Sequence, residues 1–122
     1  MARTVVTVQE TGRSAAETIT TQAADTTNGN YFDNNSQAVL LLVNNDSGLS
    51  CDVTIGTPVV IDGLALPELV VTVADGSIAV IGPFSAANYS QEDVDSGTLH
   101  AVFVNADQTA KLAAVKVGPL SG

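Results

Sequence analysis

Few side chains in this sequence could take part in chemistry, and the single histidine, His100, is the first to consider. It lies inside Thr98–Val104, a run that predicts a β-strand. Every second side chain of a strand shares a face, so His100 shares a face with Val102 and Val104 and is interpreted as a satisfied or half-exposed structural histidine. A Ser–His–Asp site would have to use His100, and no Gly-x-Ser-x-Gly segment supplies a nucleophile. We therefore predict that the protein is not an enzyme.

Oxygen-rich segments are the remaining candidates for a binding site. Glu92, Asp93 and Asp95 lie close together, and Asn and Asp also gather at 33–35 and 44–46. Calcium prefers oxygen ligands, but none of these segments has the Asp-x-Asp-x-Asp-Gly pattern with its distant Glu. The glycines are scattered, and no glycine-rich turn precedes a helix that could hold phosphate. We predict no metal site and no cofactor.

The charge balance narrows the range of partners. Lys and Arg number 4 and Asp and Glu number 13, so the formal net charge is -9 at pH 7. Negative charge opposes contact with phosphate backbones and anionic lipid, so we expect neither nucleic acid nor a membrane as a partner. The longest apolar run, 38–43, is too short to span a bilayer, and the chain begins without a signal-peptide core. We expect the protein to be made and kept in the cytosol unless something else carries it out.

The elements that must position these residues are strands. Apolar and β-branched residues alternate with polar ones, and turn residues separate the runs. The predicted strands are Thr4–Val8, Ala38–Val43, Ser50–Ile55, Val59–Ile61, Leu69–Val73, Ile78–Ile81, Thr98–Val104 and Lys111–Val117. About eight short strands without a long helix predict an all-β fold, either a small antiparallel β-sandwich or a jelly-roll-like barrel. Cys51, which alternates with Val53 and Ile55, is interpreted as a free, buried thiol.

Turn residues indicate how the strands connect. Asn, Asp, Ser and Gly at 44–48 predict a hairpin between Ala38–Val43 and Ser50–Ile55. An Asp-Gly pair at 75–76 predicts a second hairpin, in which Ile78–Ile81 pairs with Leu69–Val73.

The N-terminal part of the chain differs from the rest. Residues 9–35 are rich in Thr, Ala, Asn, Gly and Asp and contain too few apolar residues to form a core element alone. We expect residues 1–27 to form either an extended N-terminal arm or a first strand, followed by one β-sandwich domain over residues 28–122.

Several segments follow one another in a suggestive order over somewhat less than half of the chain. They are Ala38–Asn45, Cys51–Ile55, Asp62–Ala65, Val71–Gly76 and Ile81–Phe84, with Tyr89 after them. In this order they resemble the head decoration, or cement, proteins of tailed bacteriophages.

The resemblance implies a function and a location. Proteins of this kind are β-sandwiches that bind the major capsid protein and reinforce the outer capsid surface of the virion, and they have no catalytic residues. They often form homotrimers, and some lay an N-terminal arm across neighbouring capsid subunits. In this chain the arm would lie within Thr4–Thr27.

Seven residues are candidates for contact with the capsid or another partner. Alternation of Thr and Val near the N-terminus would offer a strand edge to a partner. This first group is Thr4, Val5, Val6 and Val8. The second group is Pro83, Phe84 and Tyr89. The two aromatic residues of the second group could instead fill one end of a core that has few aromatic side chains.

Two other functions remain open. A tail or head-to-tail connector component would also be a small β-domain, assembled into a closed ring. A carbohydrate-binding β-sandwich module is the other alternative, although such modules rely on exposed aromatic rings and this chain has no Trp and 2 Tyr.

Overall fold

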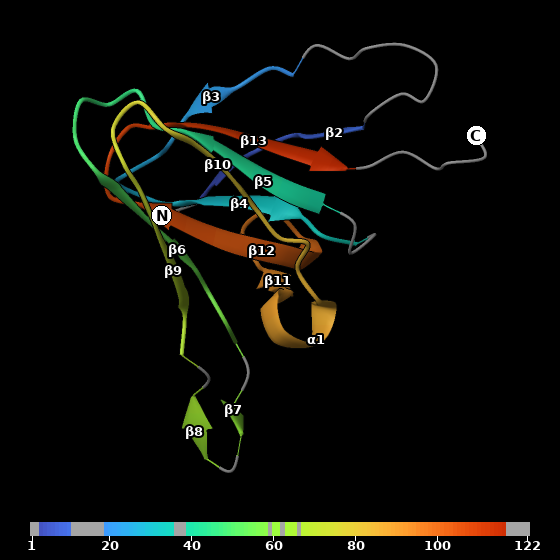
Figure 1. Cartoon of the computed structure of the whole chain (residues 1–122). Helices are drawn as coiled ribbons and strands as arrows, with labels where there is room; N and C mark the ends of the chain where they lie inside the picture. Colours follow the sequence, from blue (N-terminus) through green and yellow to red (C-terminus); the bar gives the residue numbers. More distant parts are fainter. Residues whose placement is uncertain are drawn as a thin grey trace.

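The protein folds into two β-sheets that pack face to face around an aliphatic core (Figure 1). The computed structural model describes residues 3–10, 19–35, 39–58, 60–61, 63–65 and 67–116. Parts of the expected N-terminal arm (1–2 and 11–18) and three residues of expected strands (38, 59 and 117) lie outside the described residues.

The first sheet, sheet A, has the strand order β1–β4–β12–β6–β9, with β11 paired to β12. Its strands are β1 (Thr4–Val5), β4 (Asn30–Asp33), β6 (Cys51–Ile55), β9 (Leu69–Val73), β11 (Gln91–Asp93) and β12 (Thr98–Ala106). The second sheet, sheet B, has the order β10–β5–β13–β2, with β3 also paired to β13. Its strands are β2 (Val8–Glu10), β3 (Gln22–Ala23), β5 (Val39–Asn44), β10 (Ile78–Ile81) and β13 (Lys111–Lys116).

Three short elements complete the described structure. β7 (Val60–Ile61) and β8 (Leu64–Ala65) pair with each other in a small hairpin. The one helix among the described residues, α1 (Ala86–Tyr89), is a single turn and is far too short to cross a membrane.

The all-β sandwich predicted from the sequence is confirmed, with three differences of detail. Sheet A has six strands and sheet B five, more than the predicted number, and neither closes into a barrel over the described residues. The sheets are mixed, because β1 runs parallel to β4 and β2 runs parallel to β13. The sequence did not reveal β4, because Asn30, Tyr31 and Phe32 are all buried and so show no alternation.

Most connections cross from one sheet to the other, and both predicted hairpins are therefore wrong. β5 lies in sheet B between β10 and β13, whereas β6 lies in sheet A between β12 and β9. In the same way β9 belongs to sheet A and β10 to sheet B. The turn residues do reverse the chain at both places. The reversal brings side chains face to face across the core, and each strand takes its hydrogen-bond partners from elsewhere in the chain.

Alternating side chains of the central strands fill the space between the sheets. On β5 and β6 the fully buried residues are Val39, Leu41, Val43, Cys51, Val53 and Ile55. Each such aliphatic side chain contributes roughly 1.5–3 kcal/mol through burial. The aromatic residues gather at one end, where the Phe84 ring lies 5.6 Å from Phe32 and 5.3 Å from Tyr89 between centroids.

Asn45 connects the crossing that follows β5 to the crossing that follows β9. Its backbone N–H donates to the Ser77 carbonyl (2.9 Å), and its own carbonyl accepts from the Gly76 N–H (2.7 Å). The side-chain Nδ2 donates to the carbonyls of Leu49 (2.7 Å) and Val73 (2.8 Å). Asn45 is fully buried, and its bond to the Val73 carbonyl satisfies a buried backbone group.

Two further buried asparagines act in the same way at other crossings. Asn30 accepts from the Asp25 N–H (2.8 Å) and donates from Nδ2 to the Thr4 carbonyl (3.1 Å), which joins β1 to the segment before β4. Asn34 follows β4 and donates from Nδ2 to the Phe84 carbonyl (2.9 Å). Buried amides thus hold several sheet-to-sheet crossings in place.

We predict that Asn45→Ala destabilises the fold by roughly 1–3 kcal/mol, because it removes the side-chain donor of the buried Val73 carbonyl. Urea denaturation measures this loss. The matched control is Asn88→Ala, a change at an exposed residue of α1, which should stay within about 0.5 kcal/mol of the wild type. Equal effects of the two substitutions would contradict the assigned role of Asn45.

Candidate functional site

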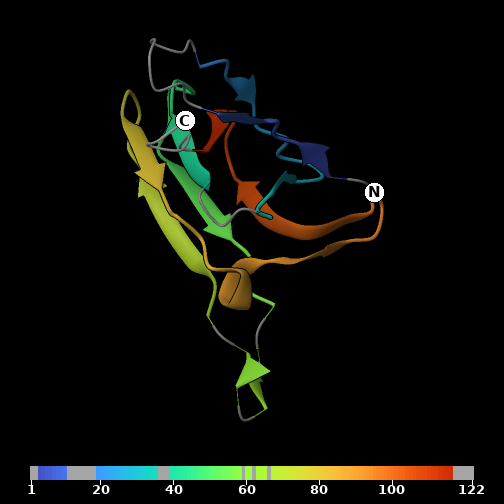
Figure 2. The same cartoon turned by 90° about the vertical axis from the view of Figure 1, so that its right-hand side faces the viewer.

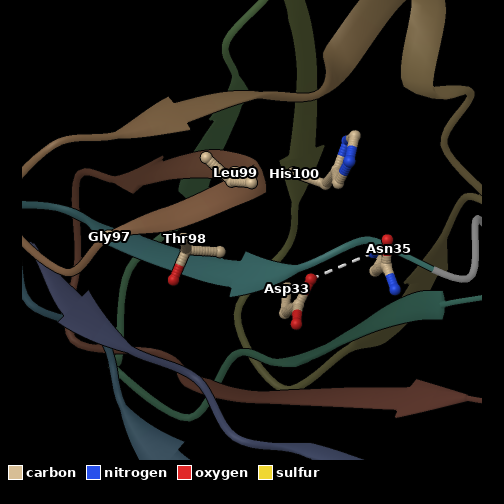
Figure 3. Close-up of a pocket in the computed structure, with 6 residues that line it drawn as sticks. All are labelled: Asp33, Asn35, Gly97, Thr98, Leu99 and His100. Carbon is tan, nitrogen blue, oxygen red and sulfur yellow. Dashed lines mark hydrogen bonds between the residues drawn. The ribbon is translucent and has the colours of Figure 1, made fainter.

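The only histidine lies in a shallow hollow between the ends of β4 and β12. The hollow has a volume of about 410 Å³ and is lined by Asp33, Asn35, Gly97, Thr98, Leu99 and His100. Figure 3 shows the imidazole directed away from the Asp33 carboxylate, which instead accepts a hydrogen bond from the Asn35 N–H (3.0 Å). His100 is exposed rather than packed with Val102 and Val104, because it lies near the start of β12, outside the buried part of that strand. Among the six residues drawn in Figure 3, the hydrogen bond marked joins Asn35 to Asp33 and does not involve His100.

The acidic segment near residue 93 forms a turn. Asp93 is buried at the end of β11, where its Oδ2 accepts from the Ser96 Oγ (2.8 Å) and its carbonyl accepts from the Gly97 N–H (2.8 Å). Glu92 and Asp95 on either side are exposed. Within the described ranges, no three His, Cys, Asp or Glu side chains come close enough together to hold a metal ion.

Cys51 is a free thiol and is fully buried, as predicted. Burial raises the pKa of the thiol above its ordinary value of 9.0, and the nearby Asp107 carboxylate adds to the shift, although a backbone hydrogen bond from Gln108 opposes it. The thiol therefore stays protonated at neutral pH and behaves as a small apolar core residue.

The N-terminal candidates are built into the sandwich. Thr4 and Val5 pair with β4, and Val8 begins the pairing of β2 with β13. Val6 lies in the hydrophobic core, so its side chain does not face a partner. For these residues the structure matches the first-strand alternative, because the chain enters sheet A at β1 and crosses to sheet B at β2.

The second group of candidates contains one exposed residue, one buried residue and one half-buried residue. Pro83 is exposed just after β10. Phe84 is buried against Phe32 and Tyr89, and Tyr89 is half-buried. Phe84 and Tyr89 therefore fill one end of the core, and Phe84 offers no surface to a partner.

A small hairpin projects from the sandwich, and none of the predicted site residues lies in it. β7 and β8, here called the finger, are inserted between β6 and β9, which pair directly in sheet A. Figures 1 and 2 both show the finger extending away from the sandwich. Leu64 at its tip is largely exposed, and exposed Pro58 and Pro67 flank it. Since a lone two-stranded hairpin is marginally stable in water, a contact outside the domain would explain its apolar sequence.

Exposed apolar side chains also occur on two strands that end the sheets. β9 ends sheet A and β10 ends sheet B, and neither has a second neighbour among the described strands. Ile78 and Val80 of β10 and Val70 of β9 are exposed. In Figure 2 both strands lie along the left side of the molecule. The Asp-Gly turn at 75–76 predicts a hairpin, in which β9 and β10 would pair with each other. Because they belong to different sheets instead, each strand has a free edge.

Comparison with known proteins gives no relative: no family model, curated protein or solved structure matches the chain. The candidate site is therefore defined by geometry, as the finger and the free edges.

A pair of neighbouring valines tests whether the N-terminus is a strand of the fold. Val6 is 1% exposed and Val5 is 45% exposed. We predict that Val6→Ala lowers the free energy of unfolding by roughly 2 kcal/mol, because a buried aliphatic side chain is shortened. Val5→Ala should change it by less than about 0.5 kcal/mol. Thermal or urea unfolding measures both, and two neutral substitutions would indicate an arm that the fold does not need.

The Asp25 carboxylate connects β1 to the turn before β4. Its carboxylate accepts hydrogen bonds from the backbone N–H of Asn28 (2.9 Å) and from Oγ1 of Thr4 (2.7 Å). These bonds lower the pKa of Asp25 below its ordinary value of 3.8, with the Asn28 bond as the largest cause. A lowered folded-state pKa gives stability that is present above the unfolded-state value and lost as the pH falls through the folded-state value.

We therefore predict that the wild type is more stable than Asp25→Asn near neutral pH and that this difference shrinks as the pH falls below 3.8. Urea midpoints across the acid range measure the difference. Asp95→Asn, at an exposed carboxylate in the turn after β11, is the control. A difference between wild type and Asp25→Asn that does not change with pH would contradict the role of the charge.

Proposed function

We propose that the protein is a structural virion protein that binds the major capsid protein and stabilises the outer surface of a tailed-phage capsid. The observation that carries the proposal is the ordered set of segments from Ala38 to Tyr89 that resembles head decoration proteins. The β-sandwich fold agrees with what that resemblance implies.

The finger supports this proposal as an element for contact. Its second strand, β8, lies within one of the resembling segments, Asp62–Ala65. The tip side chain, Leu64, projects into solvent, and the hairpin lies outside the core of its own domain. An exposed apolar side chain on a projecting hairpin fits a pocket or groove on the surface of another protein.

The charge supports the outer rather than the inner side of the shell. A chain with a formal net charge of -9 would be repelled by packaged DNA.

A homotrimer that holds several capsid subunits at once would bind durably even if each contact were weak, because the contacts act together.

The experiment is binding of the purified protein to mature, genome-filled heads that lack it. Wild-type protein should sediment with the heads in many copies spread over the shell and should raise their resistance to heat. We predict that Leu64→Asp weakens binding roughly tenfold or more, as expected for a contact residue at the centre of an interface. Val94→Asp, another change at a largely exposed apolar residue, should bind as the wild type does.

Three outcomes would contradict the proposal. Heads that fail to bind the protein, or that are equally stable without it, would exclude decoration. A single ring of protein at one vertex would favour the connector alternative.

A further inference from the structure

We propose that β10 is a self-association edge: it pairs antiparallel with β10 of a second copy of this chain, so that the two sheets B become continuous across a twofold axis. The inference does not depend on the proposed function.

The backbone of β10 has hydrogen-bonding groups that face away from its own sheet. β10 pairs with β5 through Ile78–Asn44, Ala79–Val43, Val80–Leu42 and Ile81–Leu41. Asn45 N–H donates to the Ser77 carbonyl, which makes residues 45 and 77 a hydrogen-bonded pair. Bonded and non-bonded pairs alternate along an antiparallel ladder, so Ile78 and Val80 direct their N–H and C=O groups toward the free edge. A free edge of this kind accepts an extended strand.

The side chains on the solvent face of β10 are apolar. Ile78 is 64% exposed and Val80 is 59% exposed, although both are β-branched residues that pack well against cross-strand neighbours. Pairing with a second strand would cover them, since aliphatic side chains on adjacent strands contact each other across the ladder.

Charge separates β10 from β1, β2 and β11 and favours a second copy of this chain as its occupant. The net charge of -9 makes two copies repel each other except where their contact surface is uncharged. β2 carries Glu10, β11 carries Glu92 and Asp93, and β1 follows directly after Arg3. β10, with the sequence IAVI, has no charged residue. β9 also has no charged residue, but its exposed Thr72 donates a hydrogen bond to the Asp52 carboxylate of β6, so its solvent face is not purely apolar.

Symmetry makes the same strand a suitable partner for itself. Antiparallel pairing of two identical strands generates a twofold axis, about which each residue meets its own counterpart or a near neighbour. For β10 every such meeting is between apolar side chains, so no like charges are brought together.

The first experiment measures association of the full chain by sedimentation over a range of concentrations. We expect a twofold association whose Kd rises roughly tenfold or more in Val80→Lys, because a charge on an edge strand blocks strand pairing. Leu99→Lys is the matched control: Leu99 is 66% exposed on β12, and its change adds the same charge elsewhere. Its Kd should equal that of the wild type.

Hydrogen exchange of the wild-type protein provides a readout that needs no variant. The amides of Ile78 and Val80 should exchange slowly at high protein concentration and fast at low concentration, whereas the amides of Ala79 and Ile81 should stay protected at both. Oxidation of Val80→Cys or Ile78→Cys, each combined with Cys51→Ala, should give a covalent dimer, and Leu99→Cys with Cys51→Ala should not.

A chain that stays monomeric at all concentrations would overturn the proposal. So would an association that persists unchanged in folded Val80→Lys, or exchange at Ile78 and Val80 that does not depend on concentration. Pairing of this edge with a capsid-protein strand, seen as protection only when heads are added, would also overturn it and assign the edge to another partner.

Discussion

The fold depends on satisfying backbone polar groups where the chain crosses between the two sheets. A crossing places N–H and C=O groups near the apolar core, where a group without a hydrogen bond costs about 1–3 kcal/mol. Buried Asn30, Asn34 and Asn45 supply hydrogen bonds at three of these crossings: Asn30 and Asn45 both donate and accept, whereas the Asn34 side chain donates and its buried Oδ1 has no partner among the described residues. The amide of asparagine is suited to this position because it is short, uncharged, and both a donor and an acceptor.

The arrangement of crossings has a consequence for the surface. Because β9 and β10 are joined by a crossing, each ends a different sheet, and both edges lie on the same side of the sandwich. At the other side the chain enters through β1 and β2, whose neighbourhood carries Arg3 and Glu10. β9 and β10 contain no charged residue, although Glu68 and Asp75 lie close to their ends, whereas β2 contains Glu10. An uncharged strand edge lowers the repulsion that an acidic protein would otherwise exert on an acidic partner.

The finger is a second specialised surface, separate from the edges. It is inserted into the connection between β6 and β9, so the sandwich does not need it for its hydrogen-bond ladder. Exposed apolar residues are thus placed where they leave the core intact, as expected for a surface that binds other proteins. Stability and contact are carried by different parts of the chain.

The sequence by itself determined that the protein is all-β with an aliphatic core, because alternation and turn residues are local signals, whereas the choice of a sandwich over a barrel came from the structure. It also identified Cys51 as a buried thiol, through its alternation with Val53 and Ile55. Only the tertiary structure decided which strands pair, since a tight turn at 44–48 or 75–76 serves a hairpin and a sheet-to-sheet crossing equally well. The candidate site followed the same division. The sequence located apolar Val80 and Leu64, but their exposure depended on which strands ended the sheets and which hairpin stayed outside the core, and long-range hydrogen bonds determine both.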